Sequence, residues 1–324
     1  MTLPTGPAGP SPADAATIAA RWSAQQPGAG AFSRAVYWLA IPEVDARYQR
    51  RACAGDTTRR WFAHLVDAHL GPAAAHARML SLGCGTGGLE RKLHALGAFA
   101  HFDAFDIAPG AIDAAQRDAA AEGMTNIGYQ VRDLQAEGVP RRAYDAAWFN
   151  GSLHHIERLE YVLDEVRDSL APDGWLFVNE YVGANAFGYG PRQRECIAAA
   201  FRLLPARLRR SCIAGDEGRL MEAAPLPDPD EVRRVDPSEA VRSEDIVRAI
   251  EARFDVVERN DCGGTLLQFL LAGIAGNFRA DDADAMRYLE MLFAIEDALI
   301  DGGELASDFV VLAARPKPNQ ARAS

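Results

Sequence analysis

The stretch LSLGCGTGG, at residues 80–88, constrains the fold more than any other part of the chain. The apolar run RMLSLG (78–83) leads into it as a short strand, and GLERKLHALG (88–97) follows it with a helical spacing of leucines. Glycines between a strand and a helix let the backbone approach a ligand closely and direct N–H groups at it. The stretch therefore predicts a strand–loop–helix unit with a ligand site at the loop.

The alternation of strand and helix continues after this unit. Between the strands lie helical patterns, one of which has Pro109 near its start and Gly123 at its end. Alternating strands and helices predict an α/β fold: a Rossmann-like, doubly wound, mostly parallel sheet of seven strands. The further strands are expected at 99–106, 127–133 and 144–150, then within 171–182 after a Pro-Asp-Gly turn, and, after a break in the rhythm, at 254–261 and 306–315.

The segments outside this alternation predict a helical cap on the sheet. Residues 183–240 hold short helical pieces and a Pro/Asp-rich loop at 225–237, and two apolar helices are expected at about 265–277 and 283–300. The expected organisation is a disordered tail (1–12), an N-terminal helical cap (13–76), the Rossmann core (77–182), a cap or lid insertion (183–240), completion of the core with two inserted helices (241–315) and a flexible tail (316–324).

The charge and the cysteines argue against several classes of protein. A net charge of −11 is unlike the basic excess of a general nucleic-acid binder. The 5 cysteines have no C-x-x-C spacing, so they form neither a disulfide framework nor a zinc site, and they fit a reducing cytoplasm. The most apolar stretch, 265–278, is shorter than the roughly 18 residues of a membrane span. We therefore expect a cytoplasmic protein with neither a nucleic-acid nor a membrane partner.

The glycine loop fits two cofactor patterns. Gly83, Gly85 and Gly88 match the dinucleotide fingerprint G-x-G-x-x-G. Gly83, Gly85 and Gly87 match G-x-G-x-G, the pattern of S-adenosylmethionine (SAM) loops. Asp106 ends the second strand 18 residues after Gly88, where an acid can accept hydrogen bonds from ribose hydroxyls in either case. The two patterns therefore leave the cofactor open, and the residues further along the chain have to decide.

Those residues favour SAM. The fourth strand runs into NGSLHHIE (150–157), and LAPDGWLFVNE (170–180) introduces the fifth. Over about 76–182 the sequence resembles the class I SAM-dependent methyltransferases, especially the small-molecule type with an LHHI segment and an L-x-P-x-G turn. The resemblance implies that the last strand of the sheet is antiparallel, that SAM is the cofactor, and that the substrate is a small molecule.

The resemblance also implies which residues hold SAM. The glycines frame the methionine portion, Asp106 binds the ribose diol, Ile107 packs on adenine and Asp133 bonds the adenine amine. Asn150 contacts the methionine end. The full set of expected cofactor-binding residues is Gly83, Cys84, Gly85, Gly87, Asp106, Ile107, Asp133, Leu134, Asn150 and Gly151.

The candidates for chemistry lie at the ends of the fourth and fifth strands. They are Asn150, His154, Glu180 and Tyr181, because ligands of open α/β sheets bind outside the carboxyl ends of the strands. His154 could act as a base, but a role for LHHI in starting a helix or positioning the cofactor stays open. We expect no metal, because adjacent residues such as His154 and His155 point apart on a regular element and no third ligand is evident nearby.

The cap supplies the candidates for substrate contact. Tyr37 and Trp38 lie in an aromatic, arginine-rich segment, and Tyr189 lies in a glycine-rich one that suits a mobile lid. Simple packing of the cap onto the core is the alternative for these residues. The basic cluster at 202–210 is either a solvated helix face or an attraction for an acidic substrate or an acyl-carrier protein. The apolar stretch at 265–278 suits either the core or a homodimer contact.

Four functions remain open on the sequence. The leading one is a SAM-dependent methyltransferase that acts on a small metabolite, with secondary metabolism as one setting for it. The second is an enzyme that uses the aminocarboxypropyl chain of SAM, for example by cyclising it to azetidine-2-carboxylate and releasing methylthioadenosine. A non-catalytic SAM-binding regulatory protein is the third. A dehydrogenase is the fourth and requires the dinucleotide reading of the glycine loop.

Overall fold

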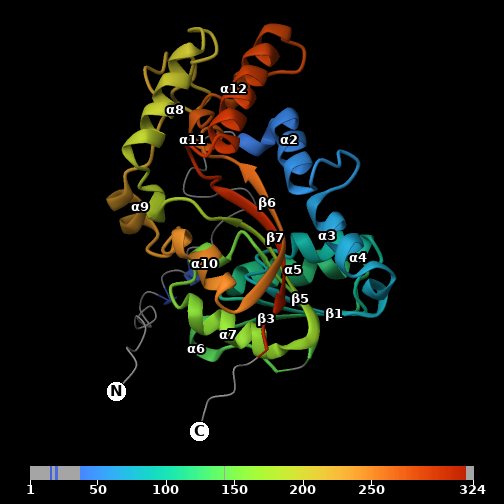
Figure 1. Ribbon diagram of the computed structural model, residues 1–324. Coiled ribbons are helices and arrows are strands. Elements are labelled where there is room, and N and C mark those ends of the chain that lie inside the picture. Colours follow the sequence, from blue (N-terminus) through green and yellow to red (C-terminus); the bar gives the residue numbers. More distant parts are fainter. Residues whose placement is uncertain (1–14, 17–18, 21–36, 142, 319–324) are drawn as a thin grey trace.

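The computed structural model describes residues 15–16, 19–20, 37–141 and 143–318 of the chain. Its centre is a seven-stranded sheet in the order β3-β2-β1-β4-β5-β7-β6, with helices on both faces (Figure 1). Strands β1 to β5 are parallel to one another, whereas β7 is antiparallel to both β5 and β6. This order and the antiparallel last strand confirm the predicted fold class.

The bounds of the strands agree with those predicted from the sequence to within three residues, except that β5 begins at Leu170 and includes the expected Pro-Asp-Gly turn. They are β1 Arg78–Leu82, β2 His101–Asp106, β3 Ile127–Val131, β4 Tyr144–Asn150, β5 Leu170–Tyr181, β6 Phe254–Gly263 and β7 Phe309–Pro316. The last strand runs to Pro316, and the backbone N–H of Lys317 still donates to the carbonyl of Arg253. The predicted C-terminal tail at 316 therefore begins inside a strand.

Alternate residues of the central strands build the core on the two faces of the sheet. Met79, Trp148 and Phe177 pack on one face with helices of the N-terminal segment, while Leu80 and Phe149 pack on the other. The helices of the first face include α3 (Trp61–His69), α4 (Gly88–Ala95) and α5 (Pro109–Ala121). Those of the second face include α6 (Leu134–Glu137), α7 (Leu159–Ser169) and α10 (Ile246–Glu251).

The remaining α-helices lie above and beside one end of the sheet (Figure 1). They are α2 (Pro42–Ala52), α8 (Pro191–Leu203), α9 (Pro229–Val235), α11 (Leu267–Leu270) and α12 (Ala283–Asp301). A buried ion pair joins them, because Nη1 of Arg47 in α2 lies 2.7 Å from Oε2 of Glu296 in α12. The other oxygen of Glu296 accepts the backbone N–H groups of Leu266 and Leu267 at the start of α11. One carboxylate therefore fixes three cap helices to one another.

Two local predictions for the cap were wrong. The expected helix at 265–277 is only α11 and a 3-10 turn at Ala275–Asn277, because Gly273 adopts a left-handed conformation with φ of 77° and ends the helix. The expected loop at 225–237 contains α9, which starts at Pro229 after the side chain of Asp228 accepts two backbone N–H groups. Most of the expected N-terminal cap before Tyr37, and the tail at 1–12, lie outside the described residues.

None of the helices among the described residues is both long and apolar enough to cross a membrane.

Candidate active site

The glycine loop lies at the carboxyl end of β1, where its backbone is bent at three positions. Gly83, Gly85 and Gly87 have φ values of 68°, 53° and 76°. A Cβ added to Gly83 would lie 2.4 Å from Cβ of Ser152, and one added to Gly87 would lie 2.3 Å from Oη of Tyr129. A Cβ on Gly85 would meet no atom of the described residues within 4 Å. Only Gly85 thus faces open space, as a backbone that approaches a ligand must.

These three environments predict different results for two alanine substitutions. Gly87→Ala should lower the free energy of unfolding by about 2–4 kcal/mol, because it adds a left-handed alanine and a clash with a buried ring. Gly85→Ala should cost only about 1–2 kcal/mol, since it adds strain without a clash. Urea denaturation of the two variants checks the order. Equal losses of stability would contradict the close packing assigned to Gly87.

Asp106 ties the end of β2 to the glycine loop. Its Oδ2 accepts the backbone N–H of Gly85 at 2.8 Å, and its Oδ1 accepts that of Ala108 at 2.9 Å. Burial raises the pKa of this carboxyl, although both N–H groups oppose the shift. Each oxygen retains a second lone pair, so the carboxylate can still accept hydrogen bonds from a ligand. Ile107, next in the chain, is half-buried.

Asp133 follows β3 and caps the short helix α6. Its Oδ1 accepts the backbone N–H groups of Gln135 and Ala136, at 2.9 and 3.3 Å. Leu134 is buried in the core of the sheet's second face. Capping of α6 uses only one oxygen of Asp133. A hydrogen bond from the adenine amine to its other oxygen stays a prediction.

The ends of β4 and β5 carry a chain of hydrogen bonds that the sequence did not indicate. Nδ2 of Asn179 donates to Oδ1 of Asn150 at 2.8 Å, and the hydroxyl of Tyr48 donates to Oδ1 of Asn179 at 2.5 Å. The two asparagines are direct neighbours in the parallel register of β4 and β5. Asn150 itself is exposed at the strand tip, so its amide is oriented while remaining accessible. Nothing in the local pattern around residue 179 indicates this role.

Glu180 is buried and organises the loop after β4. Its Oε1 accepts the backbone N–H groups of Ser152 and Leu153, at 2.6 and 2.5 Å, and its Oε2 lies 2.7 Å from Nδ1 of His154. Burial lowers the pKa of His154, but Glu180 and the nearby Glu239 outweigh it, so the net shift is upward. These bonds use Glu180 to position the loop, and the raised pKa keeps more of the His154 imidazole protonated near neutral pH, where it cannot accept a proton.

The two histidines do not point apart. They lie on the 3-10 turn Leu153–His155, and their ring centroids are 4.1 Å apart. Nδ1 of His155 lies 3.2 Å from the backbone oxygen of Ser238. Glu239, from the insertion, approaches Nε2 of His154 at 3.7 Å. The expectation that no third metal ligand lies nearby therefore does not hold. Glu239 is such a candidate, and it comes from a segment far away in the sequence.

A buried acid beneath the glycine loop also escaped the sequence analysis. Glu90 in the first turn of α4 is fully buried, and the hydroxyl of Ser81 in β1 donates to its Oε1. Burial raises the pKa of Glu90 to about 7. Its Oε2 and the hydroxyl of Tyr129 have no hydrogen-bond partner among the described residues. The available signal was a serine within an otherwise apolar strand, which needs a polar partner when buried.

Aromatic side chains continue from the ends of β5 and β7 into the cap. Trp38 is buried, with its ring centroid 5.5 Å from that of Phe309. Tyr181 packs on Phe309 at 5.4 Å and on Phe187 at 5.0 Å, and its hydroxyl donates to the carbonyl of Ala184. Tyr189 is also buried, whereas Tyr37 is 56% exposed. The structure thus brings Trp38 and Tyr181 into one aromatic cluster around Phe309.

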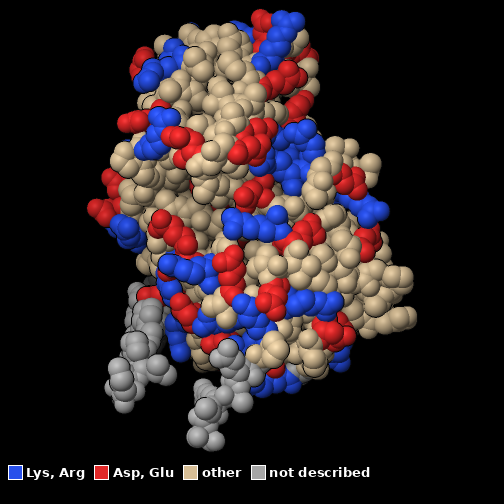
Figure 2. Space-filling model, in the orientation of Figure 1, with Lys and Arg blue, Asp and Glu red and all other residues tan. Residues whose placement is uncertain are grey.

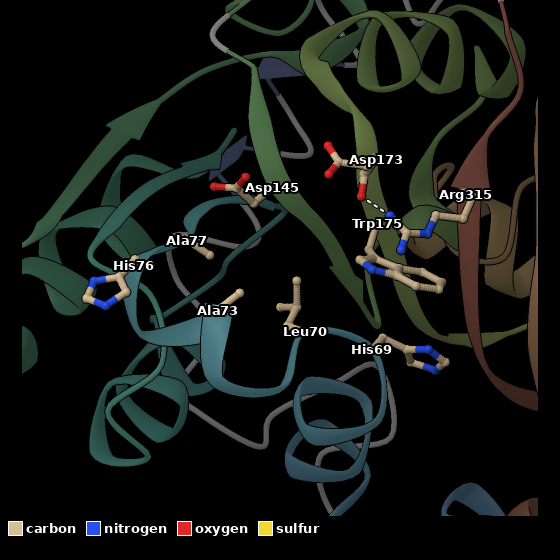
Figure 3. A pocket seen from close by; sticks show the side chains of 9 residues that line it. All are labelled: His69, Leu70, Ala73, His76, Ala77, Asp145, Asp173, Trp175 and Arg315. Atoms are coloured by element: carbon tan, nitrogen blue, oxygen red, sulfur yellow. Dashed lines mark hydrogen bonds between the residues drawn. The ribbon is translucent and has the colours of Figure 1, made fainter.

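A separate pocket of about 370 Å³ opens at the other end of the parallel strands. Figure 3 shows Trp175 and Arg315 in it, with Asp145 from the first half of β4 and Asp173 from that of β5. The guanidinium of Arg315 lies 3.7 Å from the centre of the Trp175 ring. This pocket lies at the amino ends of the parallel strands, away from the glycine loop.

Charged side chains of both signs are interspersed on the face in Figure 2. The basic cluster at 202–210 follows the same pattern: Nη1 of Arg207 lies 2.6 Å from Oδ2 of Asp282, and Nη1 of Arg210 donates to the carbonyl of Gly218. Two of its arginines are thus already engaged within the chain.

Comparison with known proteins assigns the central segment. Residues 80–176 match the family model of a methyltransferase domain. Aklanonic acid methyltransferase DauC of Streptomyces sp. (strain C5) is 36% identical over 69 residues, which are 21% of this chain and 31% of that protein. Methyltransferase calH of Penicillium decumbens is 33% identical over 122 residues, which are 34% and 33% of the two chains. The chain thus matches about a third of the length of each relative.

Solved structures support the same fold over nearly the whole chain. Geranyl diphosphate C-methyltransferase from Streptomyces coelicolor A3(2), in complex with Mg²⁺, geranyl diphosphate and S-adenosyl-L-homocysteine, has a TM-score of 0.52 at 16% identity, over 95% of this chain and 100% of that one. A geranyl diphosphate methyltransferase with its substrate and sinefungin has a TM-score of 0.53 at 15% identity, over 93% and 99%. Residues 80–176 thus match a methyltransferase domain, and the chain as a whole shares the Rossmann-like fold of these structures.

Proposed function

We propose that the protein is a SAM-dependent methyltransferase that acts on a small-molecule metabolite. The observation that carries the proposal is the glycine loop. Gly85, which has a left-handed φ and faces open space, is held by the carboxylate of Asp106 at the end of the neighbouring strand. These residues fit SAM, because a bent backbone can approach the ligand closely while the acid accepts hydrogen bonds from ribose.

The residues that would hold SAM lie at the carboxyl ends of the parallel strands. Gly83, Gly85 and Gly87 would lie beside the methionine portion and Asp106 would accept from the ribose. Asp133 would meet the adenine amine, and Asn150 would meet the methionine end. When bound, SAM supplies an electrophilic methyl group on a sulfonium. The chain's own contribution is then alignment and exclusion of water, since displacement at a methyl group depends mainly on proximity and orientation.

The loop after β4 is built to hold such an alignment. Glu180 fixes the backbone of Ser152 and Leu153, while Asn179 and Tyr48 orient the amide of Asn150. His154 is bound to Glu180 and has a raised pKa, so we infer that it acts through position and not as the general base.

The aromatic cluster supports an acceptor with apolar or flat surface. Trp38, Tyr181 and Phe309 are buried or half-buried where the strands meet the cap. Stacking against such rings favours conjugated or isoprenoid molecules over small polar ones. The name of one relative gives aklanonic acid as its substrate, and that of one structural neighbour gives geranyl diphosphate. A homodimer and a carrier-bound acceptor remain predictions from the sequence.

Product analysis tests the proposal. The purified protein is incubated with SAM and a panel of polyketide and isoprenoid diphosphate acceptors, and the nucleoside products are separated by chromatography and mass spectrometry. We expect S-adenosylhomocysteine to accumulate together with an acceptor heavier by one methylene unit. Methylthioadenosine and azetidine-2-carboxylate without any acceptor would replace the proposal with the cyclising reaction. Binding of SAM with no product from any acceptor would favour a regulatory protein.

A further inference from the structure

The insertion brings an acid to the two adjacent histidines of the loop after β4. One potential ligand atom from each of His154, His155 and Glu239 lies within 4.8 Å of the others. All three residues are partly buried. The cluster is therefore shielded from bulk water but still open to an ion. Two imidazoles and one carboxylate form a ligand set that binds divalent transition metals.

The hydrogen bonds around the cluster suit metal-binding histidines. Nδ1 of His154 lies 2.7 Å from Oε2 of the buried Glu180, and Nδ1 of His155 lies 3.2 Å from the carbonyl oxygen of Ser238. A histidine that binds a metal through one ring nitrogen usually donates the other N–H to a carboxylate or a carbonyl. Here both kinds of acceptor are present, and Nε2 of His154 faces Glu239 at 3.7 Å.

The backbone holds the acid in place on both sides. The carbonyl of Ala240 accepts the N–H of Ala186 at 2.9 Å, and the N–H of Val241 donates to the carbonyl of His154 at 3.1 Å. The segment that carries Glu239 is therefore bound directly to the loop that carries the histidines. Ligand atoms around a tetrahedral Zn²⁺ lie about 3.3 Å apart. Side-chain rotations alone could close the cluster to that spacing.

We propose that His154, His155 and Glu239 bind a divalent transition-metal ion that links the loop after β4 to the 183–240 insertion. The ion holds the insertion against the loop next to Asn150. Imidazole ligands favour Zn²⁺ over Mg²⁺, which prefers oxygen ligands in octahedral geometry. The inference goes beyond the proposed methyl transfer and does not depend on it.

Zinc retention by the full-length protein tests the site without SAM. The protein is dialysed against Zn²⁺ in excess Mg²⁺, desalted and analysed for metal content. We expect about one Zn²⁺ per chain in the wild type and in the control Glu222→Gln, whose carboxylate is exposed. Glu239→Gln and His155→Asn should each lower retention at least fivefold, and Glu239→His should restore it. Bound Zn²⁺ should also raise the melting temperature by about 5 °C.

The 5 cysteines require a second measurement, because thiolates also bind zinc. Co²⁺ replaces Zn²⁺ for this purpose, and its absorption spectrum should show no thiolate-to-cobalt charge-transfer band. Wild-type protein without retained zinc would overturn the proposal, as would equal retention by Glu239→Gln. A thiolate band would assign the metal to cysteine instead. The zinc and cobalt measurements use no SAM, so failure here is distinguishable from failure of the proposed function.

Discussion

Replacing Asp106 with asparagine should weaken SAM binding by about 10- to 100-fold, because the carboxylate is the expected acceptor for the ribose hydroxyls. Hydrogen bonds to a charged group contribute about 1.5–3 kcal/mol each, which corresponds to that range of affinity. The two carboxylate oxygens of Asp106 accept the backbone N–H groups of Gly85 and Ala108. The amide of asparagine has only one acceptor oxygen, so fewer lone pairs remain for the ribose. Titration calorimetry with SAM measures the effect.

The fold should tolerate this substitution. Burial raises the pKa of Asp106, so the folded state bears a cost for the charge that asparagine removes. We therefore expect the free energy of unfolding to change by less than about 2 kcal/mol. Asp113→Asn, at an exposed position of α5, is the matched control and should bind SAM normally. Unchanged SAM affinity in Asp106→Asn would remove Asp106 from the cofactor site.

Replacing Glu180 with alanine should be the most destabilising single change in the site, at about 3–5 kcal/mol. The substitution leaves the N–H groups of Ser152 and Leu153 and the ring of His154 without their shared acceptor in a buried setting. Urea denaturation measures the loss, provided that the dependence of the unfolding free energy on urea concentration is unchanged. The exposed Glu195→Ala serves as the control and should stay within about 0.5 kcal/mol. A loss below 1 kcal/mol for Glu180→Ala would contradict the positioning role.

The isosteric variant Glu180→Gln separates the ion pair from the two backbone bonds. Glutamine keeps an acceptor oxygen but loses the charge that raises the pKa of His154. Because the folded pKa is raised, the ion pair stabilises the protein fully below the unfolded pKa of about 6.5 and stops doing so as pH rises through the folded value. The difference in stability between wild type and Glu180→Gln should therefore be largest in acid and shrink toward alkaline pH. A constant difference would exclude His154 as the partner.

Most of the sheet could be predicted from the chain because its signals are local. Strands such as 78–83 and 144–150 are apolar runs bounded by turn residues, and the observed β1 and β4 match them within a residue. The position of Asp106 follows in the same way, since it ends a strand that must neighbour the glycine loop. The helix expected at 265–277 failed because hydropathy does not reveal that Gly273 takes a left-handed conformation.

The partners of the site residues could not be predicted in this way. Asn150 meets Asn179 only through the register of two parallel strands, and Glu180 reaches the loop after β4 from the strand beside it. Glu239 lies 84 residues from His155 in the sequence, and Glu90 becomes the partner of Ser81 only when α4 packs on β1.

The strands of the sheet and the glycine loop thus follow from periodicity and spacing, which act over a few residues. The pairing of Glu180 with His154, the approach of Glu239 and the orientation of Asn150 depend on tertiary packing. Buried polar groups must find hydrogen-bond partners wherever the folded chain places them, and no local pattern encodes where that is.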